Sequence, residues 1–425
     1  MLIKNCNLIS MAEAREKFEP SVDILIEDGK IEEIGKNLDA AGGEVIDAAG
    51  KIVMPGFINT HAHIAMSIFR ETLDGYTLQD WLEKKIWPME DKLTPDDVYT
   101  ASLLSFVEML KTGSVMANDQ YYIPESTIKA ANETGVRLML TRTICDIPPV
   151  TGGERLAELE ELIEKFNKKY DTIYFNIGIH GFYTTGSETV NKSVELAKKY
   201  NMPVHVHFCE NTQEVKDIKN NYNVDSPVDV LEKYFADVHT VLAHVVKVSE
   251  AEIDRLSKLN VSVAHCPVSN LRLGCGVAKI QYMMDKGINV TIGTDGQGSG
   301  SNMDMFDSMK FAALLQKGEF ENAANMDSYE VLKMATINGA KALGVADEIG
   351  SVEEGKSADI IMVDLGSAVC QPVGNVFSDL VYNAKGSNVV MTMVGGKVVM
   401  KEGKVPGINE KELYKKCAEI IARIS

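Results

Sequence analysis

The run from Ile52 to His63 reads IVMPGFINTHAH. Its apolar and β-branched residues predict a buried strand over residues 52–60. Two histidines follow this strand directly, and residues two positions apart in extended backbone point to the same face. We therefore expect the imidazoles of His61 and His63 to lie close enough to share one ion. A His-x-His pair on its own is also common as an ordinary surface or core pair, so the rest of the sequence has to settle its role.

Short β-branched runs of the same kind recur along the middle of the chain and alternate with amphipathic helical patterns. Together with the first run they give eight predicted strands, over residues 52–60, 114–118, 137–141, 173–180, 203–207, 240–244, 261–265 and 289–295. Strands that alternate with helices are typical of a parallel sheet. Eight of them predict an α/β fold in which residues 57–356 form a closed (β/α)8 TIM-type barrel.

The two ends of the chain have a different texture, with short strand-like runs separated by turns. Asp28-Gly29 is a hairpin signal within residues 23–31, and residues 358–365 and 389–400 show similar runs near the other end. Chain termini often lie close together. We therefore predict one small β-sandwich subdomain built from residues 1–56 and 357–425.

Composition and charge exclude several classes of protein. The chain has 425 residues, 45% hydrophobic and 24% charged, which is ordinary globular usage. A net charge of -18 argues against nucleic acid or an anionic membrane as partner, since such binders need clustered Lys and Arg. Seven scattered cysteines without a C-x-x-C pair indicate reduced thiols. We therefore expect a cytoplasmic protein with no membrane and no nucleic-acid partner.

Seven of the eight histidines lie at or just after the ends of the predicted strands: His61, His63, His180, His205, His207, His244 and His265. In a barrel of this type the carboxyl ends of the strands carry the active site. His265 is expected to be a hydrogen-bonded core histidine. His205 shares a face with His207 but lies one layer deeper, so we predict a core or supporting role for it.

A metal site is predicted at this end of the barrel. His207 ends the fifth strand, and Asp295 ends the eighth strand within Gly293-Thr294-Asp295-Gly296. Closing the barrel makes the eighth strand a neighbour of the first, which brings Asp295 to the histidine pair. Three neutral imidazoles and one carboxylate suit one divalent ion, with Zn²⁺ favoured and Fe²⁺, Mn²⁺ or Co²⁺ as alternatives.

These motifs resemble the amidohydrolase superfamily. The resemblance rests on His61-x-His63, His207-x-x-Glu210, His244, the run HCPVSN over residues 265–270, and the run GTDG over residues 293–296. More closely, the chain resembles the methylthioadenosine/S-adenosylhomocysteine deaminases, a group that includes the 5'-deoxyadenosine deaminases. That closer likeness rests on Trp81-Leu82, the run IWPME over residues 86–90, His180, and the run HFCE over residues 207–210.

The resemblance implies a catalytic site with one metal ion and a water molecule as nucleophile. The metal ligands that it implies are His61, His63, His207 and Asp295. Asp295 would also take the proton of the water, Glu210 would protonate the ring nitrogen beside C6 of adenine, and His244 would orient the attacking water. The products would be ammonia and the corresponding inosine derivative.

The resemblance also implies how a 5'-substituted adenosine is held. Glu90 would accept hydrogen bonds from the ribose hydroxyls, although its spacing alone fits an exposed helix-end carboxylate equally well. His180 would approach the purine or ribose edge, Ser299 would touch the substrate, and Arg142 or Arg155 would bind a polar 5' substituent. Relatives commonly form dimers or tetramers, so a homo-oligomer is expected.

Two other functions remain open at this point. Residues 181–186 and 296–301 differ from the usual sequences of the group, so the substrate could instead be guanine, a pterin, a triazine or a related ring. A barrel that lost catalysis could also serve as a scaffold, since fold alone does not fix function. The complete set of ligands and proton-transfer residues argues against the scaffold.

Overall fold

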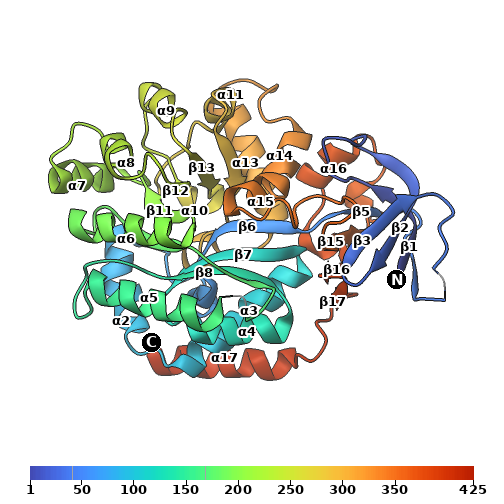
Figure 1. Ribbon diagram of the computed structural model, residues 1–425, viewed down its shortest axis with the longest axis horizontal. Helices are drawn as coiled ribbons and strands as arrows, with labels where there is room; N and C mark the ends of the chain where they lie inside the picture. Colours follow the sequence, from blue (N-terminus) through green and yellow to red (C-terminus); the bar gives the residue numbers. More distant parts are fainter. Residues whose placement is uncertain (41, 168) are drawn as a thin grey trace.

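A computed structural model describes residues 1–40, 42–167 and 169–425 of the chain. Figure 1 shows a barrel of strands surrounded by helices, with a smaller β-sheet at one side that contains the N-terminus. None of the helices in these ranges is long and apolar enough to cross a membrane. The seven cysteines all lie in these ranges, where they are buried and form no disulfide bond.

The barrel strands match the eight predicted runs. They are β6 (Phe57–Ala62), β7 (Ser114–Tyr121), β8 (Arg137–Arg142), β9 (Ile173–Phe175), β10 (Ile177–Gly181), β11 (Val204–Phe208), β12 (Thr240–His244), β13 (Val261–His265) and β14 (Asn289–Ile292). The strands from β6 to β9 form one parallel sheet, and those from β10 to β14 form another. A parallel bridge between Ile144 and Ile179 joins the two sheets at one side. At the other side the Asp295 N–H donates to the His61 carbonyl oxygen at 3.0 Å, which closes the barrel.

Two predicted strands are divided in the structure. Residues 52–60 split at Gly56 into β5 (Ile52–Pro55), which pairs in the small sheet, and β6 of the barrel. A Cβ at Gly56 would lie 2.2 Å from Cγ1 of Val115, so only glycine lets the chain pass from one sheet to the other here. Residues 173–180 split at Asn176, whose buried side chain donates to Asn118 of β7 inside the barrel.

The small sheet combines both ends of the chain. Its strands are β1 (Leu2–Leu8), β2 (Glu19–Glu27), β3 (Lys30–Gly35), β4 (Val45–Asp47), β5, β15 (Ile360–Val363), β16 (Val389–Val394) and β17 (Lys397–Lys401). They follow the order β17-β16-β15-β5-β1-β2-β3, with β4 beside β1, so early and late strands meet at the β15–β5 pair. The sheet has a hydrophobic core of its own. On this pairing we propose the division of the chain into residues 1–56 with 357–425, and residues 57–356.

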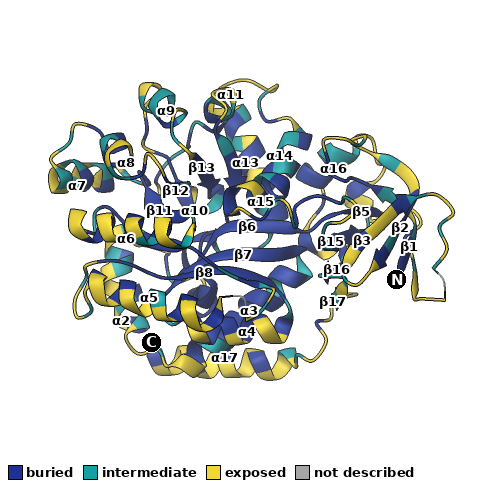
Figure 2. Cartoon of the chain, in the orientation of Figure 1, coloured by how far each residue is buried: buried dark blue, intermediate teal, exposed yellow. Residues whose placement is uncertain are grey.

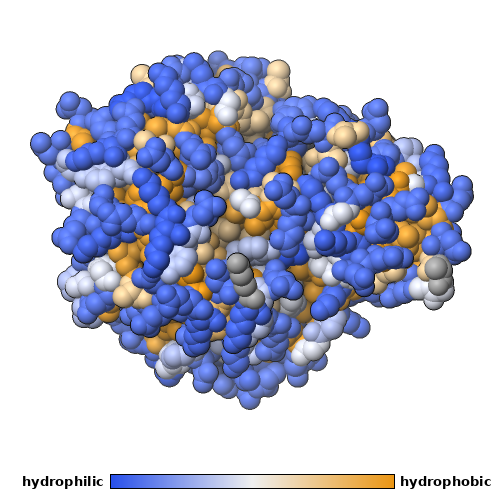
Figure 3. Space-filling model, in the orientation of Figure 1, coloured by the Kyte–Doolittle hydropathy of each residue, from blue (hydrophilic) through white to orange (hydrophobic). Residues whose placement is uncertain are grey.

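The longer helices around the barrel are α3 (Pro95–Lys111), α4 (Pro124–Thr134), α5 (Gly152–Phe166), α6 (Ser187–Tyr200), α7 (Thr212–Tyr222), α8 (Val228–Tyr234), α9 (Glu250–Leu256), α13 (Met305–Glu319), α14 (Ser328–Met334), α15 (Ile337–Leu343), α16 (Val376–Tyr382) and α17 (Glu410–Ile424). Shorter helical segments are η1 (Ile64–Phe69), α1 (Leu78–Trp81), η2 (Leu82–Ile86), α2 (Trp87–Glu90), α10 (Pro267–Arg272), α11 (Ile280–Asp285), α12 (Gln297–Gly300), η3 (Ala368–Cys370) and η4 (Gly386–Asn388). Figure 2 shows the barrel strands buried and the outer faces of the helices exposed. Figure 3 shows that hydrophilic residues cover most of this face of the molecule.

Two buried or half-buried polar contacts connect the barrel to the small sheet and to the C-terminal helix. Arg137 at the start of β8 donates through Nε to Oδ2 of Asp359 at 2.6 Å, and Asp359 directly precedes β15 of the small sheet. At the other side, α17 packs on α3 of the barrel, where Lys111 Nζ lies 2.7 Å from the Glu410 carboxylate. The C-terminal helix therefore rests against the barrel although it follows the small sheet in sequence.

Candidate active site

A cavity opens at the carboxyl end of the barrel strands. Eight of the eleven predicted site residues line it: His63, Glu90, His180, His207, Glu210, His244, Asp295 and Ser299. Its other wall is apolar and includes Leu78, Trp81 and Leu82 from the segment between η1 and α3. His61 lies just outside the lining, fully buried at the end of β6. The fold thus brings residues as far apart in the sequence as His61 and Ser299 into one polar centre beside an apolar wall.

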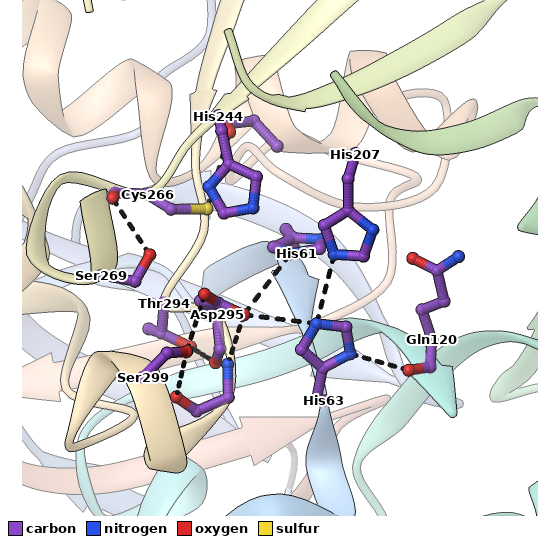
Figure 4. A network of polar contacts seen from close by, with 12 residues as sticks. His61, His63, Gln120, His207, His244, Cys266, Ser269, Thr294, Asp295 and Ser299 are labelled. Carbon is purple, nitrogen blue, oxygen red and sulfur yellow. Dashed lines mark hydrogen bonds and ion pairs between the residues drawn. The ribbon is translucent and has the colours of Figure 1, made fainter. Parts of the chain in front are cut away.

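Three histidines and one aspartate converge in this centre, as Figure 4 shows. Nε2 of His63 lies 3.3 Å from both Nε2 of His207 and Oδ1 of Asp295. Nε2 of His61 lies 3.6 Å from the same Asp295 oxygen. Ligand atoms of His61, His63 and His207 lie within 4.8 Å of one another, and so do those of His61, His244 and Asp295. Such spacings suit a single bound ion.

The hydrogen bonds of the rings leave their lone pairs facing this centre. Nδ1 of His63 donates to the Gln120 carbonyl oxygen at 2.8 Å, and Nδ1 of His207 donates to the His180 carbonyl oxygen. Nε2 of each ring is then an acceptor, since burial lowers the pKa of His207 well below its usual value and keeps this ring neutral. Two lone pairs and a carboxylate oxygen thus face one another without a proton between them, which a divalent cation would stabilise.

His61 completes the donor set. Its Nδ1 lies 2.9 Å from Nε2 of His205, and its buried Nε2 has no hydrogen-bond partner among the described residues. Burial lowers the pKa of His61 to about 4, so the ring is neutral. The supporting role predicted for His205 agrees with this contact, because a bonded Nδ1 fixes the orientation of a ligating imidazole. The residues present therefore fit a divalent metal ion.

Asp295 is held in an unusual backbone conformation. Its φ of +62° lies in the left-handed region, which few residues other than glycine adopt. The Gly296 N–H donates to Oδ1 at 2.7 Å, and the Ser299 hydroxyl donates to Oδ2 at 2.7 Å. Both of these donors stabilise the ionised form of the carboxyl group. The carboxylate is therefore ionised, and Ser299 acts on it directly.

Glu210 follows β11 and lies in the cavity opposite Asp295. Burial, with the negative charge of Asp295 nearby, raises the pKa of Glu210 to about 8. The carboxyl group is therefore mostly protonated at neutral pH and is able to donate a proton. His244 lies beside it, with Nδ1 3.8 Å from Oε1 of Glu210 and 2.9 Å from Oδ1 of Asn270.

A second buried carboxylate, Glu214 on α7, fixes the backbone that carries Glu210. The N–H groups of Cys209 and Glu210 donate to its two oxygens at 2.9 and 2.6 Å. Cys209 has φ +52°, so the turn adopts the left-handed region and needs such support. Sequence reasoning missed Glu214 as well as Asn270. The sequence holds one signal for each residue. Glu214 lies four residues after Glu210, and Asn270 ends the run HCPVSN over residues 265–270.

The structure selects between the two interpretations of Glu90. Its carboxylate lines the cavity and accepts a hydrogen bond from the Tyr121 hydroxyl at 2.7 Å, so it is no exposed helix-end group. Burial raises the pKa of Glu90 to about 7. His180 also lines the cavity, with Nδ1 2.9 Å from the Thr184 hydroxyl. Its ring lies against that of His207, at 5.2 Å between centroids.

Arg142 and Arg155 lie outside the cavity lining. Arg142 pairs through Nε with Glu158 at 2.7 Å, and Arg155 donates through Nη2 to the Ile147 carbonyl oxygen at 3.1 Å. Both guanidinium groups pack near the ring of Tyr122, at 5.7 and 5.9 Å from its centroid. Tyr122 itself lines the cavity, so it stands between these arginines and the space that a substrate would fill. Their predicted role in binding a 5' substituent stays a prediction.

His265 differs from its expectation. It is buried at the end of β13, but neither ring nitrogen has a hydrogen-bond partner in the described part of the chain. The prediction of a hydrogen-bonded core histidine is therefore wrong. Burial lowers the pKa of His265 to about 3, which makes the ring neutral and so reduces the cost of its unpaired position.

The barrel, the small sheet and the histidine–aspartate centre define a class of protein. The sequence model of the Amidohydrolase family matches residues 52–399, and the chain belongs to this family. It is 38% identical to a 5-methylthioadenosine/S-adenosylhomocysteine deaminase of Caldanaerobacter subterraneus subsp. tengcongensis, over 97% of this chain and 96% of that one. It is also 38% identical to a 5'-deoxyadenosine deaminase of Methanocaldococcus jannaschii, over 94% of this chain and 95% of that one.

Solved structures agree with this likeness. A crystal structure of an adenosine deaminase from Xanthomonas campestris with bound zinc superposes with a TM-score of 0.95. The two chains are 29% identical, and the match covers 100% of this chain and 98% of the other. The predicted family and the predicted TIM-type barrel with an additional small subdomain are thereby confirmed. The strands of that subdomain, which was predicted as a β-sandwich, pair into one eight-stranded sheet.

Proposed function

We propose that this protein is a metal-dependent hydrolytic deaminase that converts 5'-substituted adenosines to inosine derivatives and ammonia. The observation that carries the proposal is that Glu210, Asp295, His63 and His207 line one cavity, in which burial and the charge of Asp295 raise the pKa of the Glu210 carboxyl group to about 8. One group can donate a proton and another can accept one, a pair that hydrolytic deamination requires. The relatives named as 5-methylthioadenosine/S-adenosylhomocysteine and 5'-deoxyadenosine deaminases support the same substrate class.

His61, His63, His207 and Asp295 would hold the metal ion. We propose Zn²⁺, supported by the nitrogen-rich donor set and by the zinc in the adenosine deaminase from Xanthomonas campestris. A divalent ion in such a site lowers the pKa of water to roughly 7 and so supplies a nucleophile at neutral pH. The chain provides the orientation, because each ligating ring is fixed by a hydrogen bond through its other nitrogen.

Two carboxyl groups transfer protons, and one histidine orients the water. Asp295 accepts the proton of the attacking water, while the Ser299 hydroxyl and the Gly296 N–H hold its carboxylate in place. Glu210 donates its proton to the ring nitrogen beside C6, which prevents negative charge from building up on the purine. His244 orients the water. Asp295 then delivers its proton to the departing amine, so ammonia leaves as a neutral molecule. The hydroxyl group at C6 loses its remaining proton as the carbonyl forms, and this proton restores the protonated state of Glu210.

The rest of the cavity fits a nucleoside. Glu90 accepts hydrogen bonds from the ribose hydroxyls, and the Tyr121 hydroxyl fixes its carboxylate. His180 lies between this pair and the proposed metal ligands, next to His207, and so approaches the purine. The apolar wall formed by Leu78, Trp81 and Leu82 would pack on the base and the 5' substituent. Location in the cytoplasm and assembly as a dimer or tetramer stay predictions.

An ammonia-release assay on metal-replete protein tests the proposal. Methylthioadenosine, S-adenosylhomocysteine, 5'-deoxyadenosine, adenosine, adenine and guanine should be compared by kcat/KM. We expect turnover of the nucleosides, little turnover of the free bases, and about one metal ion per chain by elemental analysis. Turnover of guanine, a pterin or a triazine in preference to every nucleoside would contradict the proposal. Bound metal without any turnover would favour the scaffold alternative.

A further inference from the structure

The last turn of α17 is bonded to the chain just beyond α2, and Figure 1 shows the two helices meeting near the C-terminus. Nζ of Lys92, two residues after Glu90, donates to the Ile424 carbonyl oxygen at 2.6 Å. In return, Nη1 of Arg423 donates to the Lys92 carbonyl oxygen at 3.1 Å. We call these two reciprocal hydrogen bonds the α17 clamp. The clamp joins the C-terminal helix to the residues that directly follow the cavity wall.

The helix that provides this clamp is itself fixed to the barrel. It packs on α3 and η1. Its buried side chains form a stripe at three- and four-residue spacings: Leu413, Cys417, Ile420 and Ile424. Arg423 also pairs through Nη2 with the buried Asp97 in the first turn of α3. A backbone position that is bonded to the last turn of α17 is therefore held in place relative to the barrel.

The cavity wall that precedes the clamp has little regular structure of its own. It consists of α1, η2 and α2, which are four or five residues long and whose backbones lie close mainly to one another. Helices of this length are not stable alone, because nucleation costs more free energy than their few hydrogen bonds return. Near the first end of the wall, Nε1 of Trp81 donates to the Thr72 hydroxyl at 3.0 Å. The clamp supplies the corresponding anchor at the other end.

Backbone hydrogen bonds connect the clamp to Glu90. The Lys92 N–H donates to the Met89 carbonyl oxygen at 3.1 Å, and the Leu93 N–H donates to the Glu90 carbonyl oxygen at 2.9 Å. Residues 89–93 therefore form one turn, in which a shift of the Lys92 backbone also shifts Glu90. On the cavity side, the Tyr121 hydroxyl donates to the Glu90 carboxylate. A carboxylate that has to meet further donors at hydrogen-bond distance tolerates little displacement.

We infer that Lys92 and Arg423 are positioning residues, through which α17 fixes Glu90 for binding of the substrate. The inference rests on the proposed function of Glu90 as ribose acceptor and extends it to the C-terminal helix. Neither Lys92 nor Arg423 lines the cavity. Loss of the clamp should therefore weaken substrate binding and leave proton transfer by Glu210 and Asp295 unchanged.

A lysine beside the last turn of a helix also stabilises that helix, so the test needs a control that separates this role from positioning. Lys111→Met provides it, because Lys111 pairs with Glu410 at the other end of α17. We expect Lys92→Met to raise KM for adenosine by ~5- to 20-fold with kcat within about twofold of the wild type. Lys92→Arg keeps a donor and should restore KM, and Lys111→Met should leave both constants unchanged. An unchanged KM in Lys92→Met, or an equal rise in both methionine variants, would overturn the inference.

A double variant shows whether the effect passes through Glu90. In a Glu90→Ala background, Lys92→Met should change KM by less than about twofold, because the group that the clamp positions is absent. The full rise in KM in this background would show that Lys92 acts on binding by another route, against the inference.

Tryptophan fluorescence supplies a readout that does not depend on turnover. The chain has two tryptophans, Trp81 and Trp87, and both line the cavity from this wall. Quenching by acrylamide should increase in Lys92→Met, because a looser wall admits the quencher, and should stay at the wild-type level in Lys111→Met. Unchanged quenching in Lys92→Met would overturn the inference. A wild type that releases no ammonia from any nucleoside would overturn the proposed function, whereas the quenching comparison would still decide whether the clamp holds the wall.

Discussion

Replacing Glu210 with glutamine should abolish catalysis and stabilise the fold at the same time. The substitution keeps the size of the side chain and its backbone hydrogen bond to Glu214. It removes the ionisable proton that we assign to the ring nitrogen of the substrate. A positioned general acid contributes about 10²- to 10⁴-fold to rate, so kcat should fall by that range.

The gain in stability follows from the shifted pKa. Burial and Asp295 raise the pKa of Glu210 from 4.5 to about 8. At pH 7 the unfolded chain ionises this group and the folded chain does not, which destabilises the metal-free folded state by about 3 kcal/mol. Glutamine has no charge in either state, so the variant avoids this penalty. With an unfolding entropy of roughly 2.1 cal/mol/K per residue, the 425-residue chain should gain about 3 to 4 °C in Tm.

The sign of the pH dependence is fixed by the direction of the shift. Below about pH 4.5 the carboxyl group is protonated in both the folded and the unfolded wild type, and the two proteins should have similar stability. The advantage of Glu210→Gln should grow as pH rises and reach its full value near pH 8, above which it stays constant.

Calorimetry on metal-stripped protein from pH 4 to pH 8 measures the difference in Tm. Ammonia release and elemental analysis on metal-loaded protein measure kcat and the metal content. A variant that keeps more than about a tenth of the wild-type kcat would refute the role of Glu210 as proton donor. Loss of metal in the variant would refute the division between ligands and acid. A Tm difference that does not change with pH would refute the assigned burial penalty.

Three further predictions concern other residues. Glu90→Ala should lower kcat/KM for nucleosides by ~10- to 100-fold through loss of charged hydrogen bonds to ribose but leave the slow turnover of adenine unchanged; equal losses would contradict the ribose contact. Glu214→Gln should lower kcat by about 10- to 100-fold at unchanged metal content and nearly unchanged KM, because the backbone that carries Glu210 loses an acceptor; an unaltered kcat would show that the turn holds without it. Arg137→Met should lower Tm by about 3 to 6 °C by leaving buried Asp359 unpaired, with kcat unchanged; a stability that matches the wild type would show that this ion pair is dispensable.

Much of the fold and of the metal centre follows from local sequence. Strand periodicity, the helices between the strands and the His-x-His pair each depend on neighbouring residues, and the closure of eight parallel strands then places Asp295 beside His61. For this reason the ligand candidates and Glu210 could be predicted at the correct end of the barrel. By contrast, the cavity-lining residues Gln120, Tyr121 and Tyr122 were not predicted, because no periodicity separates such a residue from a buried core residue.

The remaining features depend on contacts between distant segments. Whether Glu90 faces the cavity or solvent depends on how α2 packs, and its partner Tyr121 comes from another strand. Arg142 and Arg155 lie outside the cavity lining, where Arg142 pairs with Glu158 and Arg155 donates to the backbone carbonyl oxygens of Val150 and Ile147. Such hydrogen bonds form, and such side chains lose contact with water, only after the barrel has closed and distant segments have packed together. The pKa of Glu210 is the clearest case, since a solvent-exposed glutamate is ionised at neutral pH, and only burial beside Asp295 keeps this carboxyl group protonated and able to donate a proton there.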